Sequence, residues 1–226
     1  MTQKMDALAV PAEDEPAWKQ RAVERSTRAA KQRAEQRVQR FLDAAQSLIT
    51  REGTTDFTVQ QVVEASNQSL RSFYQHFDGK HELLLALFED ALRRATDQIR
   101  AAASVPEDPL DRAKVAVQLL FELSRPDPGA KRPLFTEFAP RLLISHPTEV
   151  RGAHAPLLAL ISELLTEASE AGTLRPGVDP RRAAALTMQT VMFVAQSAVV
   201  PDDDDDLPVI TADEIWDFCS KGFAGA

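Results

Sequence analysis

Residues 66–84, SNQSLRSFYQHFDGKHELL, place a polar turn between two short helical segments. The first segment follows Thr58 and the second follows Ser69, and hydroxyl side chains of this kind cap helices by accepting hydrogen bonds from free backbone N–H groups. Asn67 lies in the turn, and asparagine is one of the few residues that tolerate a left-handed backbone. The sequence therefore predicts three elements in order: a helix over 59–65, a three-residue turn and a helix over 70–76.

The rest of the chain has the pattern of an all-α protein. Apolar residues recur at spacings of three and four almost throughout, and few stretches show the alternation of a strand. A long helix is expected to open the chain and to end at Gly53, and Asp78-Gly79 should separate the second short helix from a longer one. Proline-rich joints divide the remainder, and they predict helices near 80–103, 109–124, 130–145, 147–171, 180–199 and 211–223.

The composition excludes several classes of protein. The chain has 226 residues and one cysteine, Cys219, which excludes a disulfide framework and a thiolate zinc site and fits a reducing compartment. It has no signal-peptide pattern and no run of about 18 apolar residues, so we expect a cytoplasmic protein without membrane association. No phosphate-binding glycine loop, nucleophile elbow or paired acid–base motif occurs, and His76 and His81 straddle Gly79 without further metal ligands. We therefore expect no enzyme activity, no cofactor and no metal.

Charge is distributed unevenly along the chain. The net charge is −8, yet residues 16–80 hold 11 Lys and Arg against 7 Asp and Glu, whereas residues 81–226 hold 14 against 23. A basic segment in front of an acidic body gives a local electrostatic footprint that suits nucleic acid. Within this segment, the part from Lys19 to Arg37 lacks an apolar stripe, so it is either frayed or a basic arm.

Two short helices joined by a tight turn and preceded by a longer helix form the helix-turn-helix that lays its second helix in the DNA major groove. Residues 58–88, TVQQVVEASNQSLRSFYQHFDGKHELLLALF, and residues 41–53, FLDAAQSLITREG, resemble the TetR-type one-component transcriptional regulators. The most specific part of the resemblance is YQHF at 74–77, followed by a Gly-Lys step and a leucine pair. The resemblance implies three parts: a flexible or helical basic N-terminal arm over 1–35, a three-helix helix-turn-helix DNA-binding domain over 36–82, and a larger helical effector-binding and dimerisation domain over 83–226.

The family pattern implies two kinds of DNA contact. Phosphate contacts fix the register without reading sequence, and the residues implied are Thr58, Tyr74, His76 and Lys80. Base contacts fall to the start of the second short helix, and the residues implied are Gln68, Ser69, Leu70, Arg71 and Ser72. A small core beneath them would consist of Phe73 and Phe77 with Val59, Val62 and either Leu70 or Leu84. The alternative for each polar residue is plain solvation, the usual state of polar side chains on a short surface helix.

The chain departs from the family pattern at two places. Ser66-Asn67-Gln68 stands where the family usually has Ala-Gly-Val, so Gln68 brings a polar group to the position of a buried valine. Arg71 stands where a glycine often occurs, and an arginine can bind guanine O6 and N7 together, a contact worth about 1–3 kcal/mol of discrimination. We therefore expect Arg71 to be the main specificity residue and the operator to differ from those of other members.

The C-terminal part is rich in bulky apolar and thioether side chains, which suit an adaptable ligand pocket. The candidate lining residues are Phe121, Phe135, Phe138, Leu142, Met188, Met192 and Phe193, with Glu137, Gln189 and Gln196 as orienting polar groups. The alternative is that the same residues are ordinary helical core. Residues 155–172 and 179–196 are amphipathic, and we expect them to pair with the same helices of a second copy as a four-helix bundle.

Together with these patterns, the resemblance implies a ligand-responsive, homodimeric DNA-binding regulator. Two recognition helices about 34 Å apart would read a palindromic operator in double-stranded DNA, and a small, apolar effector would release the repressor from it. One rival hypothesis is a helical small-molecule-binding or adaptor protein without DNA binding. The other is an all-α enzyme, for which the sequence shows no catalytic set.

Overall fold

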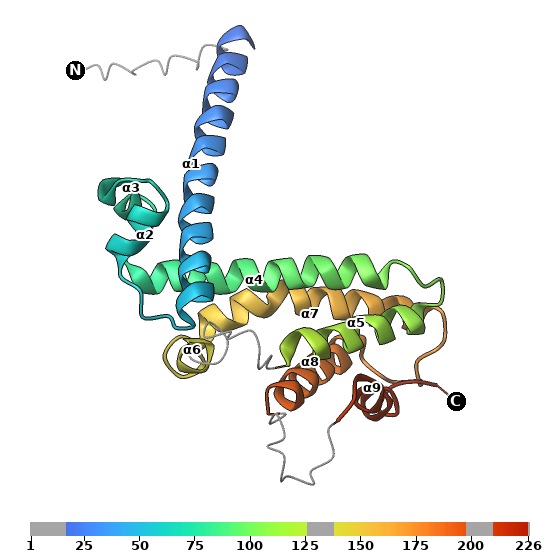
Figure 1. The fold of residues 1–226 in the computed structure, drawn as a ribbon. Helices are drawn as coiled ribbons and strands as arrows, with labels where there is room; N and C mark the ends of the chain where they lie inside the picture. The colour runs from blue at the N-terminus through green and yellow to red at the C-terminus, as the bar shows by residue number, and fades with distance from the viewer. Residues whose placement is uncertain (1–16, 126–137, 198–209, 226) are drawn as a thin grey trace, which may run out of the picture. The chain divides into compact units, whose positions relative to one another are not determined.

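The computed structural model describes residues 17–125, 138–197 and 210–225, and these residues form helices joined by turns. The helices are, in order, α1 Ala17–Glu52, α2 Val59–Ala65, α3 Leu70–Tyr74, α4 Lys80–Ala103, α5 Pro109–Ser124, α6 Ala139–Ser145, α7 Pro147–Glu170, α8 Pro180–Ser197 and α9 Ala212–Ser220 (Figure 1). The prediction of an all-α protein is confirmed. The chain divides into two compact units, Met1–Arg40 and Phe41–Ala226, and α1 runs from one into the other.

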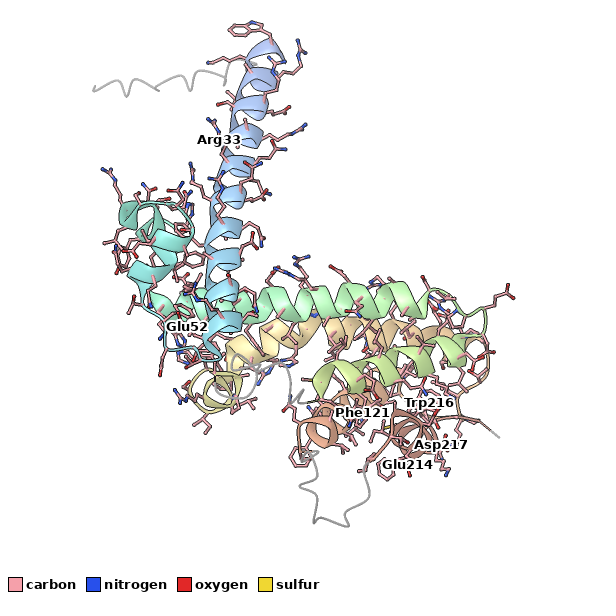
Figure 2. All side chains as sticks on the ribbon, viewed as in Figure 1. Arg33, Glu52, Phe121, Glu214, Trp216 and Asp217 are labelled. Carbon is pink, nitrogen blue, oxygen red and sulfur yellow. The ribbon has the colours of Figure 1, made fainter. Side chains whose placement is uncertain are left out.

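The described part of the first unit is the beginning of α1, residues 17–40. It is helical throughout. Most of its basic side chains are exposed, including Arg25 and Arg28, whereas Arg37 is half-buried. Arg33, which Figure 2 labels, is also exposed. Lys31 and Glu35 pair at 3.8 Å along the helix, but an exposed pair of this spacing contributes only about 0.3–0.5 kcal/mol. This stretch therefore presents its positive charge to solvent.

The helices around the predicted turn begin and end close to the expected residues. α1 ends where Gly53 adopts a φ of 66° and donates its N–H to the carbonyl of Ile49. α2 and α4 have the predicted bounds, whereas α3 ends at Tyr74, two residues earlier than predicted. The reason is a tighter last turn, because the N–H of His76 bonds to the carbonyl of Phe73, three residues back.

The body of the second unit is a set of helices packed around α5 and α7. α5 contacts α4, α7, α8 and α9, and α7 contacts α4, α6 and α8, as the parallel courses of α4 and α7 illustrate (Figure 1). The core combines small and large apolar side chains, which interdigitate at close range; among them are Ile99, Phe121, Leu157, Leu160, Ile161, Ala184, Val191 and Trp216 (Figure 2 labels Phe121 and Trp216). None of the described helices is long and apolar enough to cross a membrane.

α9 is shorter than predicted, whereas α6 can be compared with its prediction only over the described residues. α6 covers Ala139–Ser145 of the helix expected over 130–145, and residues 126–137 lie outside the described residues. α9 begins after Thr211, whose hydroxyl accepts a hydrogen bond from the N–H of Glu214 while the Glu214 carboxylate accepts one from the N–H of Thr211. It ends at Ser220, where the chain turns and the N–H of Phe223 bonds back to the Ser220 carbonyl.

Candidate functional site

Thr58 fixes the start of α2 through a reciprocal capping box. Its hydroxyl accepts a hydrogen bond from the N–H of Gln61 at 3.2 Å, and its own N–H donates to the Gln61 side-chain oxygen at 2.7 Å. The hydroxyl also donates to that oxygen at 3.0 Å, so its proton is already used within the chain. Thr58 is exposed, and a phosphate that approached it would have to open this box to gain the hydroxyl proton.

The turn between α2 and α3 closes α2 with a Schellman motif. Asn67 has a φ of 52°, in the left-handed region. Its N–H donates to the carbonyl of Glu64, and the N–H of Gln68 donates to the carbonyl of Val63, each at 3.2 Å. Glycine is the usual residue at this position of the motif, and the prediction that Asn67 takes the left-handed backbone here is confirmed.

The first turn of α3 faces solvent. Ser69 caps the helix by accepting a hydrogen bond from the N–H of Ser72 at 3.1 Å. Ser69 and Arg71 are exposed, and Leu70 is 44% exposed. The guanidinium of Arg71 has no hydrogen bond or ion pair to any of the described residues, so its donors are available to an external acceptor.

Ser72 and His76, two of the predicted DNA-contact residues, each have a buried polar side-chain atom. The Ser72 hydroxyl oxygen and the His76 Nε2 atom are covered, and neither has a hydrogen-bond partner within the described residues. A phosphate contact by His76 would therefore have to use Nδ1, and a base contact by Ser72 would require local repacking. Gln68 is half-buried and donates through its side-chain amide to the carbonyl of Asn67 at 3.2 Å. These three residues are less available to DNA than Arg71.

Phe73 is the centre of the small core beneath α3. It is fully buried, and its ring centroid lies 5.4 Å from that of Phe41, edge-on, and 5.4 Å from that of Phe77. Leu84 is buried and Leu70 is exposed, so Leu84 is the one of the two predicted alternatives that lies in the core. Edge-on aromatic pairs contribute about 0.5–1.5 kcal/mol beyond their buried area. The packing therefore holds α3 firmly while its first turn stays accessible.

Tyr74 is exposed and Lys80 is half-buried, and both carry polar groups near α3. Tyr74 is 56% exposed, and its ring packs edge-on against Phe73 at 5.4 Å between centroids. Lys80 opens α4, and its ammonium lies 5.2 Å from the ring centroid of Phe57 and 4.0 Å from a carboxylate oxygen of Asp56. Asp56 is exposed, and an ion pair in such a setting is weak. A phosphate could therefore compete with Asp56 for the Lys80 ammonium.

A cavity of about 600 Å³ lies in the body between α6, α7 and α8, with α4 contributing one wall residue. Its lining is mostly apolar and consists of Phe88, Ala139, Pro140, Leu143, Pro147, Val150, Arg151, His154, Leu158, Met188, Gln189, Met192, Phe193 and Gln196. A volume of this size is in the range of small-molecule sites.

The predicted ligand residues divide into those that line this cavity and those that do not. Met188, Gln189, Met192 and Phe193 border it, together with Gln196. Phe121 belongs instead to the core around α5, because it is fully buried among side chains of α7 and α8. Phe138 and Leu142 are buried outside this lining, and Phe135 and Glu137 lie outside the described residues.

His154 and Arg151 are the ionisable groups in the cavity wall. The Nδ1–H of His154 donates to the carbonyl of Val150 at 2.8 Å, and its ring lies 5.7 Å from that of Phe88. Burial lowers the pKa of His154, although the bond to Val150 opposes the shift, so the imidazole is neutral near pH 7. Arg151 is exposed and has no ion-pair partner among the described residues. Elsewhere in the described parts of the chain, His, Cys, Asp and Glu side chains form no group of three that could hold a metal.

α6 connects the cavity to the start of α4. Ala139, Pro140 and Leu143 of this helix line the cavity. At its two ends, the rings of Phe138 and His146 lie 5.5 Å and 4.6 Å from the ring of His81. His81 follows Lys80 directly, so a single short helix lies between the cavity wall and one of the predicted phosphate contacts.

The sequence pattern missed the contribution of α6 and α7 to the cavity. Pro147, Val150, Arg151, His154 and Leu158 recur at helical spacing along one face of α7, and this spacing was the available signal. The same segment also resembles a core or interface helix, so periodicity alone could not tell which face borders a cavity.

A capped turn that holds an exposed, arginine-bearing helix defines the class of the molecule: it is a helix-turn-helix protein with a helical body. Residues 41–87 match the model of the tetR family of bacterial regulatory proteins. Residues 41–87 are therefore a domain of this family, and the all-α fold of the described residues is consistent with that match.

Individual relatives agree with this assignment. Over 85 residues the chain is 29% identical to the HTH-type transcriptional regulator BetI of Brucella anthropi, and the match spans 38% of the chain and only 44% of BetI. The fatty acid degradation regulator FadR from Bacillus halodurans shares 22% identity with a TM-score of 0.61, over 80% of this chain and 93% of its own. FadR from Bacillus subtilis in complex with stearoyl-CoA shares 16% identity with a TM-score of 0.57, over 81% of this chain and 98% of its own. At these identities the two structures show a common fold.

Proposed function

We propose that the chain is a ligand-responsive transcriptional regulator that binds a palindromic DNA operator through α3. The observation that carries the proposal is the setting of Arg71. Its guanidinium is exposed and without a partner among the described residues, and Phe73, two residues on, is fully buried. A guanidinium on a firmly packed helix suits two simultaneous hydrogen bonds to guanine.

Phosphate contacts would come mainly from Tyr74 and Lys80. Tyr74 is exposed and Lys80 is half-buried, and the ion pair that Lys80 makes with the exposed Asp56 is weak. The backbone at the start of α2 and the Nδ1 atom of His76 are further candidates. Contacts of this kind orient the protein on the duplex without reading its sequence, and they make binding weaker as salt increases.

Two copies of the chain are proposed to pair through α7 and α8. On α8, Leu186 and Phe193 are 67% and 73% exposed, and their spacing of seven residues places them on one helix face. On α7, the exposed residues Gly152, Ala155 and Ala159 are small, which permits close approach of a second helix. Exposed apolar side chains beside such a surface are typical of an interface, and a four-helix bundle would cover them.

The cavity is the proposed effector site, and α6 is the proposed link to the DNA-binding helices. A ligand that changes the position of α6 would act on His81 and hence on the first turn of α4, because Phe138 and His146 contact that ring. If the ligand prefers an arrangement in which the two copies of α3 no longer match the operator, binding energy is lost and the repressor is released. The stearoyl-CoA complex of Bacillus subtilis FadR supports a small-molecule effector, since that protein has the same fold.

An in vitro selection from random duplex DNA with the full chain tests the proposal. We expect enrichment of two inverted half-sites with centres about 10 base pairs apart. The matched control replaces both Tyr74 and Lys80 by alanine, which should leave the protein folded and enrich no sequence. If the folded wild-type chain enriches no sequence, the proposal is wrong. If it then still binds small molecules, the alternative of a ligand-binding or adaptor protein is favoured.

A further inference from the structure

We infer that the effector of the cavity is an apolar organic acid, a compound with an apolar body and one anionic group that Arg151 binds. This inference rests on the proposed role of the cavity as the effector site, and it adds the chemistry of the ligand. It follows from how the apolar, charged and neutral polar groups are arranged in the wall.

The inner wall of the cavity is apolar. Phe88, Val150 and Met188 are buried, and Leu158 and Met192 are half-buried beside them. A ligand placed against these side chains gains affinity by removing apolar surface from water. The two methionines add adaptable packing, because thioether side chains adjust to irregular shapes. The body of the ligand is therefore apolar.

The charged side chains of the wall determine which charge the polar end of the ligand can carry. Among the described residues of the lining, Arg151 is the one cationic side chain and none is Asp or Glu. Arg151 is exposed and has no ion pair with any described residue, so its guanidinium is free to pair with a ligand carboxylate through two parallel hydrogen bonds. An ammonium ligand would meet repulsion from the same group. The wall thus favours an anion over a cation.

His154 adds no second cationic group to the wall of the cavity. Its Nδ1–H is engaged by the Val150 carbonyl, and burial keeps the ring neutral, so it adds no second positive charge. In this tautomer Nε2 is an acceptor, which repels a carboxylate oxygen and attracts a hydroxyl or N–H. The anionic group is therefore directed to Arg151 at the exposed end of the cavity, and the apolar body to the buried end.

Three matched probes test the inference: 4-phenylbutyrate, 4-phenylbutanol and 4-phenylbutylammonium. Calorimetric titration into the full chain without DNA should show that the acid binds about tenfold more tightly than the alcohol, the difference expected for a charge-assisted hydrogen bond. The ammonium compound should bind most weakly. Arg151→Gln should weaken the acid far more than the alcohol and so remove the preference, and Arg151→Lys should keep part of it. Arg141→Gln, an exposed arginine of α6 outside the lining, is the control and should change nothing.

A second variant locates the binding site. Met192→Trp fills part of the cavity and should weaken all three probes, with folding checked by circular dichroism and thermal unfolding. Equal affinity of the wild type for acid and alcohol would overturn the inference. So would a preference for the acid that survives in Arg151→Gln, or a wild type that binds none of the probes. DNA selection is measured separately. If the probes fail these tests while the chain still selects an operator, only the proposed ligand class is wrong. If the probes bind as expected while the chain selects no operator, only the proposed regulator function is wrong.

Discussion

Arg71 and Phe73 lie two positions apart on α3 and have opposite surroundings. Arg71 extends into solvent, whereas Phe73 is enclosed by the rings of Phe41 and Phe77. Because these contacts fix the backbone beneath Arg71, only the arginine side chain has freedom left to lose when it meets a base. A change at Arg71 should therefore alter DNA reading and leave folding almost unchanged.

Arg71→Ala should relax the base preference at one position of each half-site by about 1–3 kcal/mol. The free energy of unfolding should change by less than about 0.5 kcal/mol, as for most exposed side chains. Repeating the DNA selection with the variant gives the preference position by position. Gln75→Ala, an exposed change at the end of α3, is the control and should leave the preference intact. An unchanged preference in Arg71→Ala would show that another residue reads the base.

Tyr74→Phe should weaken binding to every DNA sequence alike. The change removes the exposed phenol hydroxyl but keeps the ring that packs on Phe73. We expect a loss of about 1 kcal/mol, the contribution of a typical hydrogen bond. Titration with the selected operator and with a scrambled duplex of equal length measures it, and a loss confined to the operator would contradict a phosphate role.

His154 should make the protein less stable in acid. Burial lowers its folded-state pKa from the ordinary value of 6.5. As the pH falls through this value the unfolded chain takes up the proton first, so the free energy of unfolding decreases and levels off only below the folded-state pKa. Urea unfolding at a series of pH values from about 8 to 5 should show this decrease. His154→Phe should show a smaller one, and an identical decrease would assign the effect to other groups.

The residue roles that could be predicted from sequence are those set by local chemistry. Thr58, Asn67 and Ser69 act on backbone groups within three or four positions, so their neighbours in the chain are sufficient to identify them. The covered atoms of Ser72 and His76 could not be predicted in this way. Their burial depends on side chains that come from other elements.

At the scale of the elements, α2 and α3 depend on their surroundings. Helices of seven and five residues are too short to be stable alone, because nucleating a helix is unfavourable. The side chains of Thr58 and Ser69 accept hydrogen bonds from free backbone N–H groups at the starts of the two helices. The buried Phe73 packs α3 against its surroundings. The left-handed turn at Asn67 then sets the angle at which one follows the other.

Replacing Asn67 tests the turn. Asn67→Ala should lower the free energy of unfolding by about 1 kcal/mol, because a left-handed backbone is unfavourable for a residue with a Cβ that forms no local hydrogen bond. Asn67→Gly should be neutral or stabilising, since glycine adopts this backbone readily. Urea unfolding of both variants measures the difference. Equal stability of the two would mean that the turn is set by packing instead.

Helix positions were more predictable than the cavity they enclose. Prolines, caps and periodicity place α2, α4 and α5 within a residue of their bounds. The cavity is lined mainly by α6, α7 and α8. Which face of each helix borders the cavity depends on how the helices pack together, and local sequence does not determine this. Phe121 has the composition of a ligand residue, but its helix turns it into the core.

At the scale of the whole molecule, the proposed regulator requires two copies. A palindromic operator offers two equivalent half-sites, and one copy can occupy only one of them. The exposed Leu186 and Phe193 on α8 are the apolar side chains that a second copy would cover. Pairing and operator affinity should therefore be lost together.

Leu186→Glu should convert the dimer to monomers, because it places a charge in the proposed bundle. Operator affinity should fall by at least about 100-fold, since the two half-sites are no longer bound by one linked unit. Sedimentation velocity and operator titration measure the two effects. Val105→Glu, an equally apolar and exposed site at the end of α4, is the control and should change neither. A dimer that survives Leu186→Glu would place the interface on another face.

The exposed first turn of α3 also bears on how such a regulator diversifies. Ser69, Leu70 and Arg71 are exposed, and the core beneath is built from other residues. If these positions read bases as proposed, point substitutions at Leu70 and Arg71 would alter the recognised sequence while the scaffold keeps its stability, whereas a change at Ser69 would also remove the cap of α3. A duplicated gene could acquire a new target in single steps, each encoding a folded protein. The same separation makes these positions the natural choice for a library meant to retarget the protein.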